Sequence, residues 1–154
     1  MQIQSIGHVV LKVRDLEKSV PFYTEALGLK EVARSGRGMV FFAIEDNHHD
    51  IAIVETGGDA PSAPDNAPGL AHLALKVGNS LDDLRKAKAW LESKGVEIDR
   101  TADHDVSKSI YFHDPDGNEL EFFVDGDPKI WRDEPSRVAT RLPLDLEEPA
   151  KEPA

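Results

Sequence analysis

At 154 residues, with 40% hydrophobic and 31% charged residues, the chain suits one globular domain with a single sizeable core. Its formal net charge of −11 argues against nucleic acid and anionic membranes as partners, because both carry negative charge. It has no cysteine for a disulfide or a thiolate, no signal-peptide pattern and no long apolar run, so a cytoplasmic protein is expected.

The first half of the chain predicts one strand, one amphipathic helix and three further strands. The stretch GHVVLKV at 7–13 has the alternation of a strand with two different faces. Asp15 is the expected N-cap of a helix over LEKSVPFYTEAL, and Gly28 is expected to end it. Short strands are then expected at about 29–34, 38–45 and 49–55.

The second half repeats this order. AHLALKV at 71–77 returns at an offset of 64 residues, and Ser80 is placed to cap a second helix, LDDLRKAKAWLESKG. Three strands are again expected, at about 97–101, 107–113 and 118–124. The sequence therefore predicts an α+β fold of two tandem βαβββ modules, 3–55 and 70–125, joined by the Gly/Pro-rich loop 56–69.

The composition changes after residue 125. Residues 126–154 contain five of the ten prolines and show no periodicity. An extended strap is expected there, with Ile130, Trp131 and Leu142 as anchors, ending in a disordered acidic, Pro-rich tail. The predicted organisation is thus one domain over 1–125 followed by the strap and tail.

Two histidines stand at equivalent positions of the two repeats. His8 and His72 each belong to the polar face of a predicted strand, and Glu121 lies in the middle of the last strand. One such residue alone is most often a solvated surface residue. Two imidazoles and one carboxylate that converge would instead form a facial triad, suited to Fe(II) and less exclusively to Mn(II), Ni(II) or Zn(II). Spacing alone does not show convergence, because the three residues come from separate strands.

The stretches GHVVLKVRDLEKSVPFYTEALGL, LAHLALKV and YFHDPDGNELEFF resemble the vicinal oxygen chelate superfamily. That group includes glyoxalase I, fosfomycin- and bleomycin-resistance proteins, and the type I extradiol (catechol-cleaving) dioxygenases. The resemblance covers about residues 4–125, and IWRDEPSRVATRLPLDL resembles extensions of the catechol-dioxygenase-like members. It implies a cup-shaped mixed sheet around a metal site, with His8, His72 and Glu121 as ligands.

The resemblance to single-domain extradiol enzymes also implies catalytic roles. His49 matches their acid–base histidine, Tyr111 matches the tyrosine that contacts a substrate hydroxyl, and His104 matches, with a variable spacing, a second active-site histidine. His48 and His113 match no catalytic residue, and a solvated or turn-stabilising role is expected for both. The implied protein is a homodimeric Fe(II) dioxygenase that cleaves a small aromatic diol with O₂.

Two alternatives stay open. Glu55 lies 47 residues after His8, close to the 49 residues between His72 and Glu121, so it is an alternative ligand near the repeat equivalent of Glu121. Two histidines and two glutamates with Ni(II) or Zn(II) would suit a glyoxalase I-like isomerase. A resistance-type protein that binds a small molecule without catalysis is the third candidate. The sequence does not decide whether the modules pair within one chain or across a dimer.

Overall fold

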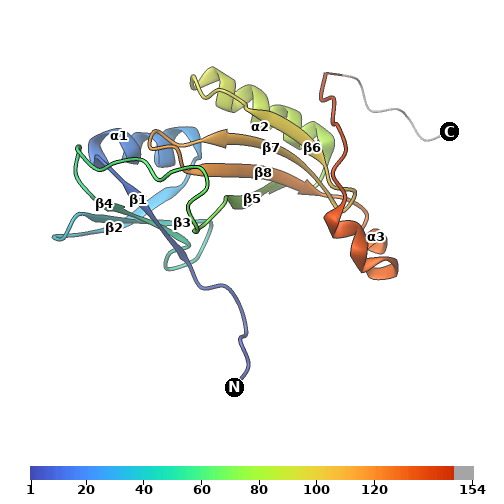
Figure 1. Ribbon diagram of the computed structural model, residues 1–154, viewed down its shortest axis with the longest axis horizontal. Helices are drawn as coiled ribbons and strands as arrows, with labels where there is room; N and C mark the ends of the chain where they lie inside the picture. The colour runs from blue at the N-terminus through green and yellow to red at the C-terminus, as the bar shows by residue number, and fades with distance from the viewer. Residues whose placement is uncertain (148–154) are drawn as a thin grey trace. The chain divides into compact units, whose positions relative to one another are not determined.

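The computed structural model describes residues 1–147 (Figure 1). The disordered tail predicted at the C-terminus falls largely on residues 148–154, which lie outside the described residues. The chain divides into two compact units: Met1–Ala67 with Asp114–Asn118, and Pro68–His113 with Glu119–Ala154. Each unit contains one four-stranded sheet.

The first unit has the predicted order of elements. They are β1 (Val9–Val13), α1 (Leu16–Pro21), the π-helical turn η1 (Phe22–Ala26), β2 (Lys30–Ser35), β3 (Met39–Ala43) and β4 (Ile51–Glu55). The strand order in the sheet is β1-β4-β3-β2. β1 pairs with β4 in parallel, and the other neighbours are antiparallel.

Local chemistry sets the bounds of the helix in this unit. Asp15 caps α1, because its side chain accepts a hydrogen bond from the backbone N–H of Glu17. Pro21 ends α1, and the chain continues directly as the wider turn η1. Gly28 then adopts a φ of +72°, a left-handed conformation that suits glycine and turns the chain toward β2.

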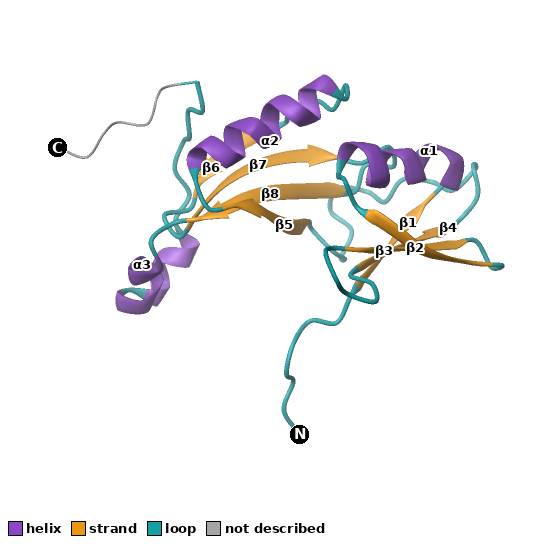
Figure 2. Cartoon of the chain, turned by 180° about the vertical axis from the view of Figure 1, so that it is seen from behind, coloured by secondary structure: helices purple, strands orange, loops and turns teal. Residues whose placement is uncertain are grey.

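The second unit repeats the arrangement. Its elements are β5 (Leu73–Gly78), α2 (Leu81–Ser93), β6 (Arg100–Asp103), β7 (Ser107–His113), β8 (Glu119–Asp125), α3 (Pro128–Asp133) and the 3₁₀-helix η2 (Pro135–Ala139). The strand order is β5-β8-β7-β6, again with the first and last strands of the module parallel. α2 packs against this sheet (Figure 2) and is capped by Ser80, whose side chain accepts from the backbone of Asp83. The predicted α+β fold with two repeated modules is confirmed.

Each unit buries one face of its sheet against its helix. The fully buried large side chains of the first unit are Val13, Tyr23, Val40, Phe42, Ile51 and Ile53. Those of the second are Leu84, Leu91, Ile110, Phe112, Leu120 and Val124. These are the apolar positions of the alternating strands and of the helical stripe, so burial of the apolar faces drives the formation of both modules.

The segment after residue 125 differs from its prediction. It was expected to be extended, but it begins with α3 and η2, because the Asp127 side chain accepts from Lys129 and a proline follows the cap. Two of the expected anchors, Trp131 and Leu142, are 46% and 51% exposed, whereas Leu146 is only 5% exposed. Leu146 is therefore the buried apolar contact of this segment. Within residues 1–147 no helix is long and apolar enough to cross a membrane.

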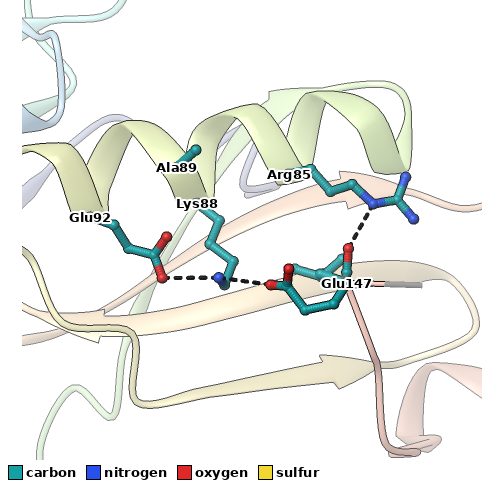
Figure 3. Close-up of a pocket in the computed structure, with 6 residues that line it drawn as sticks. Arg85, Lys88, Ala89, Glu92 and Glu147 are labelled. Carbon is teal, nitrogen blue, oxygen red and sulfur yellow. Dashed lines mark hydrogen bonds and ion pairs between the residues drawn. The ribbon is translucent and has the colours of Figure 1, made fainter. Parts of the chain in front are cut away.

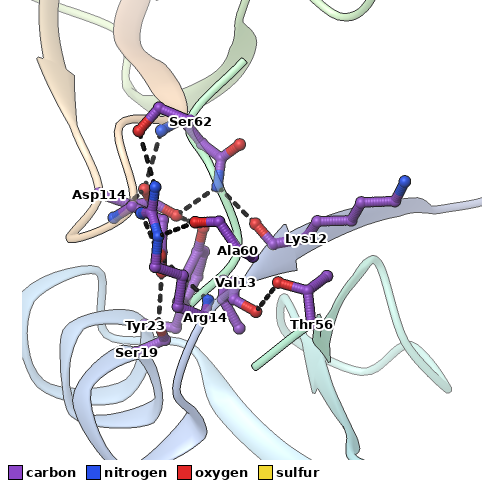
Figure 4. A network of polar contacts seen from close by, with 11 residues as sticks. Lys12, Val13, Arg14, Ser19, Tyr23, Thr56, Ala60, Ser62 and Asp114 are labelled. Atoms are coloured by element: carbon purple, nitrogen blue, oxygen red, sulfur yellow. Dashed lines mark hydrogen bonds and ion pairs between the residues drawn. The ribbon is translucent and has the colours of Figure 1, made fainter. Parts of the chain in front are cut away.

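A largely buried polar network connects the turn Asp114–Asn118 to the rest of the first unit (Figure 4). The hydroxyl of fully buried Tyr23 donates to Asp114 Oδ2 at 2.7 Å. The backbone N–H and the guanidinium of Arg14 donate to Asp116 Oδ1 at 3.0 Å, and the Ser19 hydroxyl donates to Asp116 Oδ2 at 3.1 Å. Burial and the neighbouring Asp114 raise the pKa of Tyr23 well above its usual value, so this phenol stays a donor.

Candidate metal centre

His72 and Glu121 meet at the start of β5 in the second unit. His72 directly precedes β5. Glu121 lies on the parallel strand β8, where it is paired with Ala74 of β5. His72 Nε2 lies 3.0 Å from Glu121 Oε2. Glu121 is 6% exposed, so a carboxylate that the alternating pattern could have left in solvent is in fact buried.

Ser109 on the adjacent strand β7 fixes the orientation of this carboxylate. Its hydroxyl donates to Glu121 Oε1 at 2.5 Å, and Ser109 is itself fully buried. Oε1 is thereby occupied, and Oε2 is the oxygen that faces His72. In an octahedral ion with bonds of about 2.1 Å, two adjacent ligand atoms are about 3 Å apart. The observed 3.0 Å separation of Nε2 and Oε2 suits two ligands of one divalent metal, and it equally suits a direct hydrogen bond between the imidazole and the carboxylate.

A second carboxylate lies behind His72. Glu119 Oε1 is 3.7 Å from His72 Nδ1, the nitrogen that does not face Glu121. Arg100 holds Glu119 through two hydrogen bonds, of 2.9 Å and 2.7 Å, and these lower the pKa of the Glu119 carboxyl. At 3.7 Å this carboxylate makes no hydrogen bond to His72, and it acts on the imidazole only through its negative charge.

Tyr111 and His104 adjoin this pair. The Tyr111 hydroxyl lies 2.9 Å from His104 Nε2, and the Tyr111 ring meets the His72 ring edge-on at 5.6 Å between centroids. The Arg100 guanidinium stacks 3.9 Å from the centre of the Tyr111 ring. Burial first, and the charge of Glu121 second, raise the pKa of Tyr111, so its phenol carries a proton at neutral pH.

The other two candidate histidines lie in the first unit. His8 directly precedes β1, and the rings of His8 and His49 are 4.5 Å apart. His48 Nδ1 lies 2.7 Å from His49 Nδ1. Partial desolvation first, and then the nearby His8 and His48, lower the pKa of His49. His49 therefore has the neutral form that a general base needs.

Strand register gives Glu55 a different place from the one its spacing suggested. In the second unit Glu121 is opposite Ala74, whose counterpart in the first repeat is Val10. The residue opposite Val10 is Ala52, whereas Glu55 is opposite Val13. Glu55 Oε1 accepts a hydrogen bond of 3.1 Å from the backbone N–H of Leu16, the first residue of α1. The register thus shows that Glu55 is not the repeat equivalent of Glu121, and its carboxylate supports a helix N-terminus.

The structure groups the predicted site residues by unit. His72, Glu121, Tyr111 and His104 are gathered in the second unit, and His8 lies with His49 in the first. Among residues 1–147, no three His, Asp or Glu side chains are gathered so that they could hold a metal ion.

Sequence reasoning missed several supporting residues. Ser109, Arg100 and Glu119 each contact the predicted set, but each does so across neighbouring strands. The only signal in the sequence was the alternation that puts Glu119 on the same face as Glu121. The side chain of His113 is exposed, and its Nδ1 lies 2.6 Å from Asp99 Oδ2.

The sequence model of the Glyoxalase/Bleomycin resistance protein/Dioxygenase superfamily matches residues 5–122 of the chain. The chain belongs to this superfamily. The resemblance inferred from its motifs is thereby confirmed. A solved member, the glyoxylase/bleomycin resistance protein/dioxygenase domain from Frankia sp. EAN1pec, is 29% identical with a TM-score of 0.66, over 80% of this chain and 99% of that one.

Two kinds of enzyme are among the curated relatives. Biphenyl-2,3-diol 1,2-dioxygenase 3 of Rhodococcus globerulus is 32% identical over 78% of this chain, and catechol-2,3-dioxygenase of Bacillus subtilis is 32% identical over 92%. Metallothiol transferase FosB of Lysinibacillus sphaericus is also 32% identical, over 79%. The chain spans 63% and 50% of the length of the two dioxygenases, and 83% of the transferase.

Proposed function

We propose that the chain is an Fe(II)-dependent extradiol dioxygenase that opens the ring of a small catechol-type substrate with O₂. The observation that carries this proposal is the contact between Tyr111 and His104 beside the converging His72 and Glu121. A metal-ligand pair alone would suit any member of the superfamily. A protonated phenol paired with an imidazole at the same place adds the groups needed to bind and polarise a substrate hydroxyl.

His8, His72 and Glu121 are proposed to hold the metal. Two imidazoles and one carboxylate leave open positions, so that a bound Fe(II) can bring a catechol and O₂ together; Mn(II) also suits this ligand set, and Ni(II) or Zn(II) less so. The chain's own contribution is to preorganise the ligands. Ser109 directs one oxygen of Glu121 away from the metal position, and Glu119 with Arg100 stands behind His72.

His49 is proposed to move the protons. Its lowered pKa keeps the imidazole neutral, so it can accept the proton that a catechol hydroxyl loses on binding. The protonated ring can then return that proton during ring opening. A general acid–base of this kind contributes about 10²–10⁴-fold in rate.

One alignment favours ring cleavage over thiol transfer, although the alignment with biphenyl-2,3-diol 1,2-dioxygenase 3 covers only 78% of this chain, about as much as the alignment with the transferase. The alignment with catechol-2,3-dioxygenase covers 92% of this chain, so it necessarily extends into the residues after 125. Those residues contribute Thr140, which contacts His104. The alignment with the metallothiol transferase covers 79%, a length that does not require this segment.

A thiol transferase acting in fosfomycin resistance is the second candidate. It is favoured by one observation: the chain spans 83% of the metallothiol transferase, but only 50% of catechol-2,3-dioxygenase. We further propose a cytoplasmic homodimer. The net charge of −11 supports the absence of a nucleic-acid or anionic-membrane partner, because both carry negative charge.

A paired assay separates these functions. The protein is purified without oxygen, loaded with Fe(II) or Mn(II), and divided between two reactions. One contains a panel of catechols and biaryl diols in air, and the other contains fosfomycin with a low-molecular-weight thiol. A yellow ring-opened product from a diol, with fosfomycin unchanged, supports the proposal. Consumption of fosfomycin and thiol with every diol intact overturns it in favour of the transferase.

A further inference from the structure

We propose that the strap, residues 126–147, fixes His104 in the tautomer protonated at Nδ1, through the backbone carbonyl of Thr140. This tautomer directs the phenol proton of Tyr111 toward His104 and leaves the Tyr111 oxygen as an acceptor. Thr140 and the strap residues that hold it are therefore positioning residues, since they act through His104 and not on the substrate.

Two contacts of His104 determine the tautomer. Nδ1 lies 2.8 Å from the carbonyl oxygen of Thr140, and Nε2 lies 2.9 Å from the hydroxyl of Tyr111. A carbonyl oxygen can only accept, so Nδ1 must carry the hydrogen. In a neutral imidazole Nε2 then has none, and the hydrogen of the second bond must come from Tyr111.

The opposite tautomer has a physical cost. If Nε2 carried the hydrogen, Nδ1 and the Thr140 carbonyl would be two acceptors facing each other at 2.8 Å. In that arrangement Tyr111 would receive a hydrogen bond from His104 and would donate its own proton to Glu121, the carboxylate that competes with His104 for the phenol proton in this structure. The Thr140 carbonyl disfavours this arrangement as long as the strap keeps it in place.

The strap is held on both sides of His104. Asp103 and Leu142 exchange two backbone hydrogen bonds, of 2.9 Å and 2.8 Å. Arg137 donates to Asp105 Oδ2 from Nε at 3.1 Å, and its Nη2 lies 3.0 Å from the same oxygen. Asp103 and Asp105 are the two neighbours of His104 in the chain, so the strap and the histidine are fixed against each other.

The end of the strap is anchored farther along the same unit. The Thr101 hydroxyl donates to the carbonyl of Leu144 at 2.5 Å. Arg85 on α2 donates to the carbonyl of Leu146 at 2.8 Å, and Lys88 pairs with Glu147 at 3.1 Å (Figure 3). The strap thus follows β6 and reaches α2, but the contacts of Arg137 with Asp105 and of Leu142 with Asp103 are the ones that flank Thr140 in the chain.

The consequence for catalysis rests on the proposed function. A catechol hydroxyl that approaches Tyr111 meets an oxygen whose own hydrogen is already committed to His104. The substrate then donates to Tyr111, and this helps it to lose its proton. The strap would in this way set the direction of hydrogen bonding at the substrate through a backbone carbonyl.

The tautomer can be observed directly by NMR. The six histidines are labelled with ¹⁵N, and long-range ¹H–¹⁵N spectra are recorded under conditions in which the ring shifts show neutral imidazole. His104 is assigned by the loss of its signals in H104Q. We expect the Nδ1-protonated form of His104 in about five- to tenfold excess, the effect of about one net hydrogen bond. Protonation of Nε2 in the unmodified protein would overturn the proposal, whatever the protein catalyses.

A matched pair of variants tests the role of the strap. R137M/L142P removes the ion pair with Asp105 and the N–H that Leu142 donates to Asp103. R141M/L142A changes an exposed arginine and the same leucine, but it keeps that N–H. The excess of the Nδ1-protonated form should disappear only in the first variant. An unchanged excess in a folded R137M/L142P protein, judged by the other histidine signals, would show that the strap does not set the tautomer.

Discussion

His72 Nε2 and Glu121 Oε2 lie 3.0 Å apart, although three strands and a helix separate the two residues in the sequence. The parallel pairing of β5 with β8 brings them together, and Ser109 leaves only one oxygen of Glu121 facing His72. The contact thus joins a preorganised carboxylate and an imidazole in the geometry of two adjacent metal ligands.

Replacing Glu121 by Gln should weaken the binding of Fe(II) or Mn(II) by more than the roughly 10–100-fold that even outer partners of metal ligands contribute. The glutamine amide is neutral and binds a divalent cation less well than a carboxylate, and the Ser109 hydroxyl can still donate a hydrogen bond to its oxygen. Metal content and affinity are measured on protein purified without oxygen. E97Q, which changes an exposed glutamate of the same unit, is the control and should bind metal normally. Equal occupancy in the two variants would show that Glu121 is not a ligand.

Replacing His49 by Gln should leave bound metal unchanged and lower the rate of ring opening by about 10²–10⁴-fold, because the proposed proton carrier is lost. H48Q is a matched control, since His48 is the neighbouring residue and contacts the His49 ring. Metal content and single-turnover rates are compared in the same preparations. If H49Q loses its metal, then His49 is a ligand; if H48Q is as slow as H49Q, the effect is not specific to a base at position 49.

Glu55→Gln should keep the full metal content and reduce thermal stability only slightly. The amide oxygen can still accept the hydrogen bond from the N–H of Leu16, and only the favourable charge at the start of α1 is lost, worth about 0.3–1 kcal/mol. Metal analysis with thermal unfolding measures both effects. A large fall in metal content would show that Glu55 is a ligand and would support the four-ligand, glyoxalase I-like site.

Tyr23→Phe should destabilise the protein by about 1–3 kcal/mol, because it leaves one oxygen of a buried carboxylate without its hydroxyl donor. Asp114 keeps its backbone donors at Asp116 and Asn118, so the turn should persist. Urea unfolding gives the free energy of both proteins. A loss below about 0.5 kcal/mol, the size of an ordinary surface substitution, would mean that this bond does not help to hold the turn in the first unit.

Arg137→Met should reduce stability at neutral pH, and the deficit should shrink as the solution is acidified. The hydrogen bond from Arg137 lowers the pKa of Asp105 in the folded protein. A lowered folded-state pKa contributes stability above the unfolded value, about 3.9, and this contribution is lost as the pH falls through the folded value. R141M is the control and should show no such dependence. A deficit that is independent of pH would assign the effect of Arg137 to packing.

The repeats in the sequence predicted most of the fold, because burial of alternating apolar positions leaves little freedom. GHVVLKV and AHLALKV form edge strands with the expected faces, although β1 and β5 begin one residue after His8 and His72. The helices after residue 125 were missed. They are short and have no buried residue, and the cap at Asp127 and the proline at the start of each helix set them more than any periodic pattern does.

The site was less predictable than the fold because its contacts depend on strand register. A shift of three positions separates Glu55 from the counterpart of Glu121, and spacing along the chain could not show it. The same holds for Ser109, whose hydroxyl reaches Glu121 from the neighbouring strand. The hydrogen bond from His104 to Thr140 joins residues on two distant segments, and no pattern in the sequence signals it.

The stoichiometry of oxygen consumption is the most direct test of whether the protein is a ring-opening dioxygenase. The iron-loaded protein is mixed with a limiting amount of a catechol that gives a ring-opened product, and dissolved O₂ is followed with an electrode. A dioxygenase should consume one O₂ per molecule of ring-opened product and release no hydrogen peroxide, so that addition of catalase returns no oxygen. Oxygen uptake that forms peroxide without opening the ring, or no uptake with any diol of the panel, would contradict the proposed function.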